Sequence, residues 1–226
     1  MPSLTAELTT LRRLLLTMGA EVEQRVDHAF DALLKHDLRL AERVRDTDDD
    51  VDALDLNVES ECAAILALHQ PVAGDLRYVM AALRINADLE RAADLARGVA
   101  KRAIKLEYGR PFERPAALGE MAHSIRAMVS DCLGALADMD TARAYRVRLS
   151  DKQVDKQYKS LMRWALAQIE AQTIDPKSLL DIIAIMRSME RIADLCTNVA
   201  ESVVFAADGL VVRHSPVEAT PESDVA

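Results

Sequence analysis

The sequence contains few of the residues that interrupt helices or build covalent frameworks. Of its 226 residues, 7 are glycine and 7 are proline, aromatic residues make up 4%, and the 3 cysteines show no Cys-x-x-Cys spacing. Since alanine and leucine are abundant instead, this composition favours a helix-rich protein with an ample core. The scattered cysteines indicate buried small side chains in a reducing compartment and argue against a disulfide framework or a zinc site.

Several functional signals are also absent. No apolar run approaches the ~18 residues needed to span a bilayer, and the Leu14-Leu15-Leu16 run is too short for a signal peptide. The net charge is −9 and no Lys/Arg run is interleaved with aromatics, so nucleic acid is not an expected partner. The chain has no P-loop, G-x-G-x-x-G or G-x-S-x-G motif. We therefore expect a cytoplasmic protein that is not an enzyme.

Apolar residues that recur every three to four positions predict amphipathic helices throughout the chain. We expect helices over residues 5–35, 38–68 and 75–108, and then over 118–139, 141–172 and 177–207. Asp37, Asp140 and Asp175 are the expected N-caps, the last of them followed by Pro176 at the first helical position. Gly109 and the prolines that follow it separate the first three helices from the last three.

The second half of the sequence repeats the first. Met18 and Asp37 match Met121 and Asp140 at an offset of 103, and the segment Glu-Arg-x-Ala-Asp-Leu occurs at 90–95 and again at 190–195. The change in offset lies near the turn between the second and third helix of each half, where deletions are tolerated. We predict an all-α fold of two tandem three-helix bundles, residues 1–110 and 111–208, followed by a mobile tail over 209–226.

Each half contains carboxylates at i and i+4 on its second and third helices. The pairs are Asp48/Asp52 and Glu90/Asp94 in the first half, and Asp151/Asp155 and Glu190/Asp194 in the second. The two helices are joined by a short turn, so they should lie antiparallel. Both pairs of a half are about twenty residues from that turn, which at ~1.5 Å per residue places them at a similar height. Four converging carboxylates would suit Mg²⁺, Mn²⁺ or iron better than zinc.

Two other interpretations of these acidic residues stay open. A duplicated salt-bridge pattern could leave the same trace, because Arg91, Arg97, Arg187 and Arg191 are close in sequence. A ferritin-like di-iron site is less well supported, because Glu120 and His123 form a single Glu-x-x-His step where such sites need two.

Several motifs, in order, resemble the PhoU family of phosphate-transport accessory and regulatory proteins. They are Met18-Gly19 with Val22-Glu23-Gln24, Asp75-Leu76-Arg77, and Glu-Arg-x-Ala-Asp in both halves, and the resemblance covers residues 5–206. It implies two three-helix bundles whose acidic motifs hold multinuclear metal clusters; the motif positions here are Asp48, Asp52, Glu90, Asp94, Asp151, Asp155, Glu190 and Asp194. One departure is Ala92-Ala93, where Ile-Gly is commoner.

The resemblance also implies a function. It predicts a negative regulator of the phosphate-starvation response that acts between the ATPase subunit of the phosphate ABC transporter and a membrane sensor histidine kinase. The apolar faces of the long helices make a homodimer a reasonable expectation. A metal-dependent enzyme or iron store, and an accessory subunit of a different phosphate permease, are the alternatives.

Overall fold

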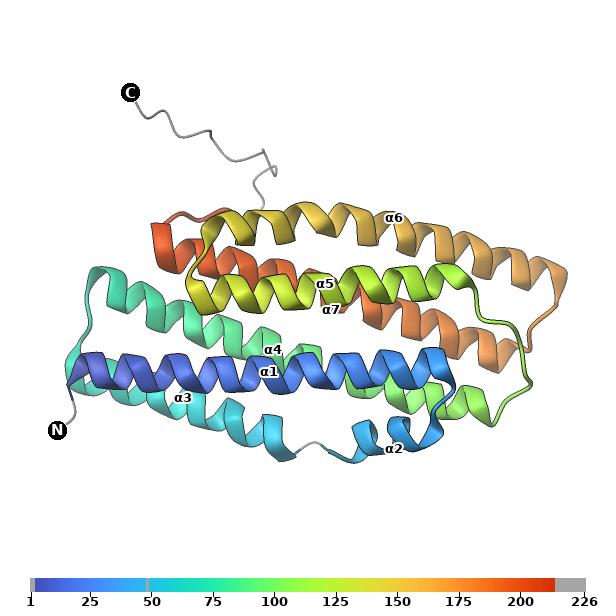
Figure 1. Cartoon of the computed structure of the whole chain (residues 1–226), viewed down its shortest axis with the longest axis horizontal. Coiled ribbons are helices and arrows are strands. Elements are labelled where there is room, and N and C mark those ends of the chain that lie inside the picture. Colours follow the sequence, from blue (N-terminus) through green and yellow to red (C-terminus); the bar gives the residue numbers. More distant parts are fainter. Residues whose placement is uncertain (1–2, 48, 214–226) are drawn as a thin grey trace, which may run out of the picture.

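A computed structural model describes residues 3–47 and 49–213 of the chain, and all of its regular elements are helices that run along one long axis (Figure 1). The helices of the first repeat are α1 (Leu4–Lys35), α2 (Leu38–Asp46), α3 (Asp49–His69) and α4 (Ala73–Glu107). Those of the second repeat are α5 (Ala116–Asp138), α6 (Thr141–Ala171) and α7 (Pro176–Asp208). The predicted all-α fold of two helical bundles is therefore confirmed, while the division at residue 110 stays a prediction.

The three predicted N-caps are present. The side chain of Asp37 accepts a hydrogen bond from the backbone N–H of Leu40 at 3.0 Å, and Asp140 accepts one from Arg143 at 2.9 Å. Asp175 accepts from the backbone of Ser178 at 3.1 Å and is followed by proline. These carboxylates satisfy amides that have no partner within the helix, so they determine where the helices begin.

One predicted helix is wrong. The sequence pattern predicts a single helix over 38–68, but the structure has a break between α2 and α3. Thr47 ends α2, and both its N–H and its hydroxyl hydrogen-bond to the carbonyl of Arg43, at 3.1 and 2.8 Å. Threonine and aspartate favour helix ends because their side chains compete for backbone hydrogen bonds. The matching part of the second repeat, with Ser150 in place of Thr47, lies within the continuous helix α6.

The two repeats pack against each other mainly through their last helices, α4 and α7, which lie in the centre of the molecule (Figure 1). Alanines such as Ala93 and Ala193 are buried in these two helices and keep their buried surfaces flat. A second contact joins α1 to α5, where a Cβ on Gly19 would lie 2.6 Å from a methyl carbon of Leu133. The repeats therefore share one continuous hydrophobic core.

Ion pairs and the start of the C-terminal segment complete the packing. Arg126 on α5 pairs with Asp27 and Asp31 on α1, at 3.0 and 2.6 Å, across the boundary between repeats. After α7, the carbonyl of Val212 accepts a hydrogen bond from Arg148 at 2.9 Å, so the first residues beyond α7 lie against α6. The rest of the predicted tail, residues 214–226, lies outside the described residues.

Candidate metal centres

The second repeat brings its four predicted carboxylates within electrostatic range of one another. Asp151 and Asp155 are on α6, and Glu190 and Asp194 are on α7. Burial and then the charges of Asp194 and Asp155 raise the pKa of Asp151 to about 6. Such a shift means that like charges are crowded together in a partly dry environment. We call these four residues the second acidic cluster.

The pKa values of the two α7 residues in the second acidic cluster are raised as well. Burial, followed by the charges of Glu190 and Asp155, raises the pKa of Asp194 to about 6. The Asp194 side chain reaches solvent on the outer side of α7. The pKa of Glu190 is also raised, by burial and then by Asp155 and Asp151, while Arg187 and Arg191 oppose the shift. The four carboxylates of this cluster therefore act on one another electrostatically, and their role as metal ligands stays a prediction.

The first acidic cluster consists of Asp52 on α3 with Glu90 and Asp94 on α4. Burial and then the charges of Asp94, Asp55 and Asp52 raise the pKa of Glu90. Asp94 instead forms an ion pair with Arg97 at 2.7 Å. The predicted ligand Asp48 lies outside the described residues, so its place in the cluster stays a prediction.

Two further charged residues, which were not predicted from the sequence, act on the first acidic cluster. Asp55 lies one turn after Asp52 on α3, and the buried amide of Asn86 on α4 donates a hydrogen bond to its carboxylate at 2.6 Å. Arg25 on α1 is buried, and among the charges that act on its guanidinium those of Asp52 and Asp50 have the largest effect. The spacing of Asp52 and Asp55 could have indicated the first of these, but nothing in the sequence places α1 against the cluster.

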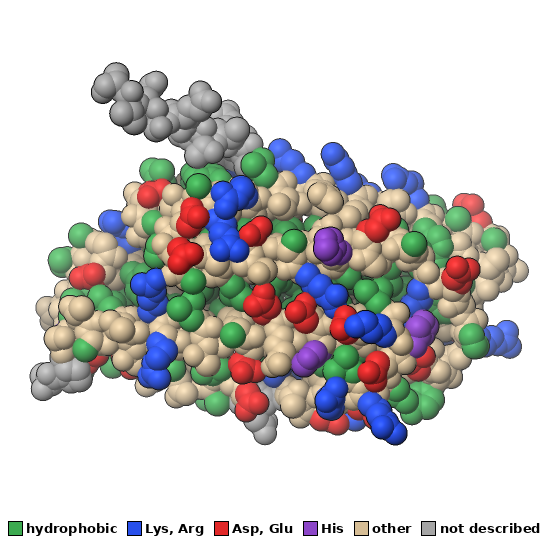
Figure 2. All heavy atoms as spheres, in the orientation of Figure 1, with side chains coloured by type: hydrophobic (Ala, Val, Ile, Leu, Met, Phe, Trp, Pro, Cys, Tyr) green, Lys and Arg blue, Asp and Glu red, His purple; other side chains and the backbone are tan. Residues whose placement is uncertain are grey.

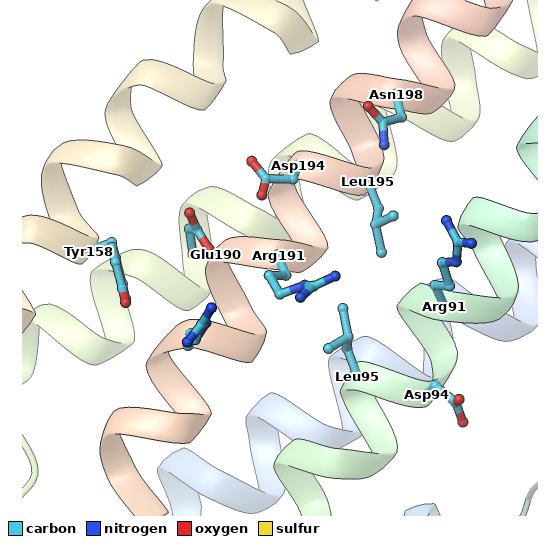
Figure 3. Close-up of a pocket in the computed structure, with 10 residues that line it drawn as sticks. Arg91, Asp94, Leu95, Tyr158, Glu190, Arg191, Asp194, Leu195 and Asn198 are labelled. Carbon is cyan, nitrogen blue, oxygen red and sulfur yellow. The ribbon is translucent and has the colours of Figure 1, made fainter. Parts of the chain in front are cut away.

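A hollow of about 810 Å³ lies between α4 and α7, and residues from equivalent positions in the two repeats line it. Figure 3 shows Leu95 and Leu195 facing each other across this hollow, with Asp94 on one side and Glu190 and Asp194 on the other. The two acidic clusters are therefore separate, one on each repeat. Arg91 and Arg191 line the same hollow.

The donor atoms of both clusters are carboxylate oxygens, which hard cations such as Mg²⁺ and Mn²⁺ prefer. Burial, followed by the charges of neighbouring carboxylates, raises the pKa values of Asp151 and Asp194, and a bound cation would offset both effects. Across residues 3–47 and 49–213, however, no three His, Cys, Asp or Glu residues are gathered closely enough to form a ready-made metal cage. The residues thus fit a cation in charge and chemistry, and they would have to draw closer to hold it.

The fold and the duplicated acidic clusters define a class of protein: helical bundles made of two tandem three-helix repeats. Comparison with protein families identifies the class further, because the family described as "PhoU domain" matches this chain twice, over residues 15–103 and 118–203. The chain belongs to the PhoU family, as its motifs predicted.

Individual relatives agree with this assignment. The chain is 39% identical over 213 residues to the "phosphate-specific transport system accessory protein PhoU homolog" of Pseudomonas aeruginosa, covering 92% of this chain and 87% of that protein. It is 32% identical over 209 residues to the "phosphate-specific transport system accessory protein PhoU" of Escherichia coli K12, with coverages of 92% and 87%.

Solved structures show the same fold. The crystal structure of PhoU from Pseudomonas aeruginosa superposes with a TM-score of 0.88 at 36% identity, covering 92% of this chain and all of that one. The "phosphate transport system regulatory protein PhoU" of Streptococcus pneumoniae superposes with a TM-score of 0.86 at 26% identity, with coverages of 93% and 99%.

Proposed function

We propose that this chain is an accessory protein of phosphate transport that restrains uptake and the phosphate-starvation response when phosphate is plentiful. The observation that supports this proposal is the match of both repeats to the PhoU domain, together with relatives named as accessory proteins of the phosphate-specific transport system. The protein would act by binding partners rather than by catalysis, and we propose no reaction for it.

The partners we propose are the ATPase subunit of the phosphate ABC transporter and a sensor histidine kinase, met on the cytoplasmic side of the membrane. None of the helices in the described part of the chain is both long and apolar enough to cross a membrane. Both bundle ends expose large apolar side chains, with Val72 74% exposed before α4 and Leu180 67% exposed on α7. Exposed apolar groups of this size favour contact with another protein, either these partners or a second copy in a homodimer.

The surface charge also favours protein partners over nucleic acid. Figure 2 shows Lys/Arg and Asp/Glu side chains interspersed over one face of the molecule. Nucleic-acid-binding surfaces concentrate positive charge in a patch or stripe instead. The net charge of −9 points the same way.

We further propose that the acidic clusters bind Mg²⁺, Mn²⁺ or iron. The ligands would be Asp52, Glu90 and Asp94 with Asp48 in the first repeat, and Asp151, Asp155, Glu190 and Asp194 in the second. A cation would offset the burial and the repulsion among carboxylates that raise the pKa of Asp151 and Asp194. In the bound form it would join α6 to α7, and α3 to α4.

The decisive experiment is a phosphate-starvation reporter, such as secreted phosphatase activity, in phosphate-rich medium with and without this gene. We expect constitutive activity in the deletion strain and repression when the wild-type gene is restored. An unchanged reporter would reject the regulatory proposal and favour a metal store or an accessory subunit of a different permease.

Metal binding is tested separately on purified protein. Glu90→Ala with Asp94→Ala should lower the metal content while leaving the helical circular dichroism signal intact, because both side chains lie on the outer part of α4. Unchanged metal content would exclude the first acidic cluster as a binding site. The same variant in the reporter strain shows whether metal is needed for regulation.

A further inference from the structure

A buried positive charge lies within electrostatic range of the first acidic cluster. Arg25 on α1 is only 7% exposed, and it lines a hollow of about 220 Å³ with Glu21 and Asp50, next to the break between α2 and α3. The negative charges of Asp52, Asp50, Glu21 and Asp94 all act on its guanidinium. A charge buried this deeply is stable only when opposite charges compensate it.

A second arginine, on α4, contacts a carboxylate of the same cluster. Arg97 lies three residues after Asp94 on α4, and its guanidinium is 2.7 Å from the Asp94 carboxylate. Arg97 is therefore held against one of the carboxylates that would bind a cation. Arginines on both α1 and α4 therefore act on the carboxylates of the first acidic cluster.

The second repeat has neither arginine. At the offset of 103 that matches Met18 to Met121, the counterpart of Arg25 is Met128, which is 2% exposed in α5. At the offset of 100 that matches Glu90 to Glu190, the counterpart of Arg97 is Thr197. In the part of the chain that the structure describes, neither Asp151 nor Asp194 forms an ion pair comparable to that of Asp94.

We propose that Arg25 and Arg97 are internal counter-ions of the first acidic cluster, and that the second cluster, which lacks them, binds a hard divalent cation more tightly. This inference rests on the proposed metal binding and adds a difference between the two clusters. A cation entering the first cluster must compete with two guanidinium groups for the same carboxylates. A cation entering the second cluster meets no arginine at the positions that match Arg25 and Arg97. Arg187 and Arg191 offset part of the charge of Glu190 there, as Arg91 does for Glu90 in the first cluster.

The test uses the full-length protein freed of metal and titrated with Mn²⁺, with binding followed by the electron paramagnetic resonance signal of free Mn²⁺. The wild type is compared with Glu190→Gln/Asp194→Asn and with Glu90→Gln/Asp94→Asn. We expect the tightest binding to disappear only in Glu190→Gln/Asp194→Asn. Equal losses in the two variants would overturn the proposed difference, whereas a wild type that binds no Mn²⁺ would reject metal binding itself.

An exchange of residues between repeats then tests the arginines directly. In the Glu190→Gln/Asp194→Asn background, Arg25→Met with Arg97→Thr should tighten Mn²⁺ binding at the first cluster about tenfold or more, because the competing charges are gone. Lys105→Thr is the matched control, since it removes one positive charge two turns further along α4 at an exposed position. Tightening by Lys105→Thr of equal size would show a general charge effect and overturn the assignment to Arg25 and Arg97.

The reverse exchange leaves the buried Arg25 and Met128 unchanged. Thr197→Arg in the otherwise wild-type chain places an arginine three residues after Asp194 at a half-buried position. We expect Mn²⁺ binding at the second cluster to weaken about tenfold, with an unchanged circular dichroism spectrum. Wild-type affinity in this variant would overturn the proposal even if the variant lacking Arg25 did not fold.

Discussion

The two repeats share a fold and a set of carboxylates, yet they differ around those carboxylates. The first repeat interrupts its middle helix at Thr47 and places Arg25 against its acidic cluster, while the second keeps α6 continuous and has Met128 at the matching position. Burial and then the neighbouring carboxylates raise the pKa values of Asp151 and Asp194 to about 6, whereas Asp94 is paired with Arg97. Duplication has kept the scaffold while the electrostatic surroundings of the two clusters have diverged.

The largest expected effect tests whether the repeats are equivalent in the core. Met18 and Met121 occupy matching positions and are both fully buried. Either methionine changed to alanine should lower the free energy of unfolding by about 2–5 kcal/mol, because each leaves a cavity in the shared core. Urea denaturation followed by circular dichroism measures this loss. Two separate transitions would contradict a continuous core, since each repeat would then unfold alone.

The next effect is a pH dependence that belongs mainly to the second repeat. The pKa of Asp151 and of Asp194 is about 6 in the folded protein, against ~3.9 in an unfolded chain. The folded state therefore binds more protons than the unfolded state in this range. The stabilisation is fully present below pH ~4 and is lost as pH rises through 6, on the order of 1 kcal/mol after allowance for solvent screening.

Thermal melts of metal-free protein between pH 4 and 7 measure this slope. Asp151→Asn with Asp194→Asn should flatten it, and Glu90→Gln in the first repeat should reduce it less because it removes a single group. A variant Asp151→Asn/Asp194→Asn that kept the full wild-type slope would contradict the crowding of the second acidic cluster.

A smaller effect concerns the ion pairs that join the repeats. Arg126→Ala removes the contacts from α5 to Asp27 and Asp31 on α1 and should cost about 0.5–1 kcal/mol, because the groups are partly exposed. Arg45→Ala is the control, since Arg45 pairs with the adjacent, exposed Asp46 within α2. Urea denaturation measures the free energy of unfolding of both variants. Equal decreases would show that the ion pairs between repeats stabilise the fold no more than an exposed pair within one helix.

The smallest effect concerns the helix break itself. Thr47→Ala removes the hydroxyl that bonds to the Arg43 carbonyl and replaces threonine by a better helix former, so stability should change by only a few tenths of a kcal/mol. Hydrogen exchange at the amides of Arg45 and Thr47 should slow as α2 extends. Ser150→Ala, at the matching position inside α6, should leave local exchange unchanged. Faster exchange after Thr47→Ala would show that Thr47 stabilises the end of α2 instead.

The sequence predicted the helices and the carboxylates better than it predicted their surroundings. Asp37, Asp140 and Asp175 are local signals, since a cap needs only its own helix, and all three were correctly identified. The break at Thr47 was missed because the apolar periodicity continues across it. Arg25 and Asn86 were missed because each reaches the acidic cluster from a helix distant in sequence, and helical periodicity does not determine which neighbour a given face will meet.

By itself, the sequence determined the helical fold, the duplication and the eight acidic positions, because helix periodicity, capping and repeat spacing are properties of neighbouring residues. Only the tertiary structure decided which charges surround those positions. The electrostatic environment of a carboxylate depends on every chain segment packed against it, and here α1 brings Arg25 to the first cluster while α5 has Met128 at the matching position. The two clusters therefore have matching carboxylates in the sequence but differ in the charged residues that surround them.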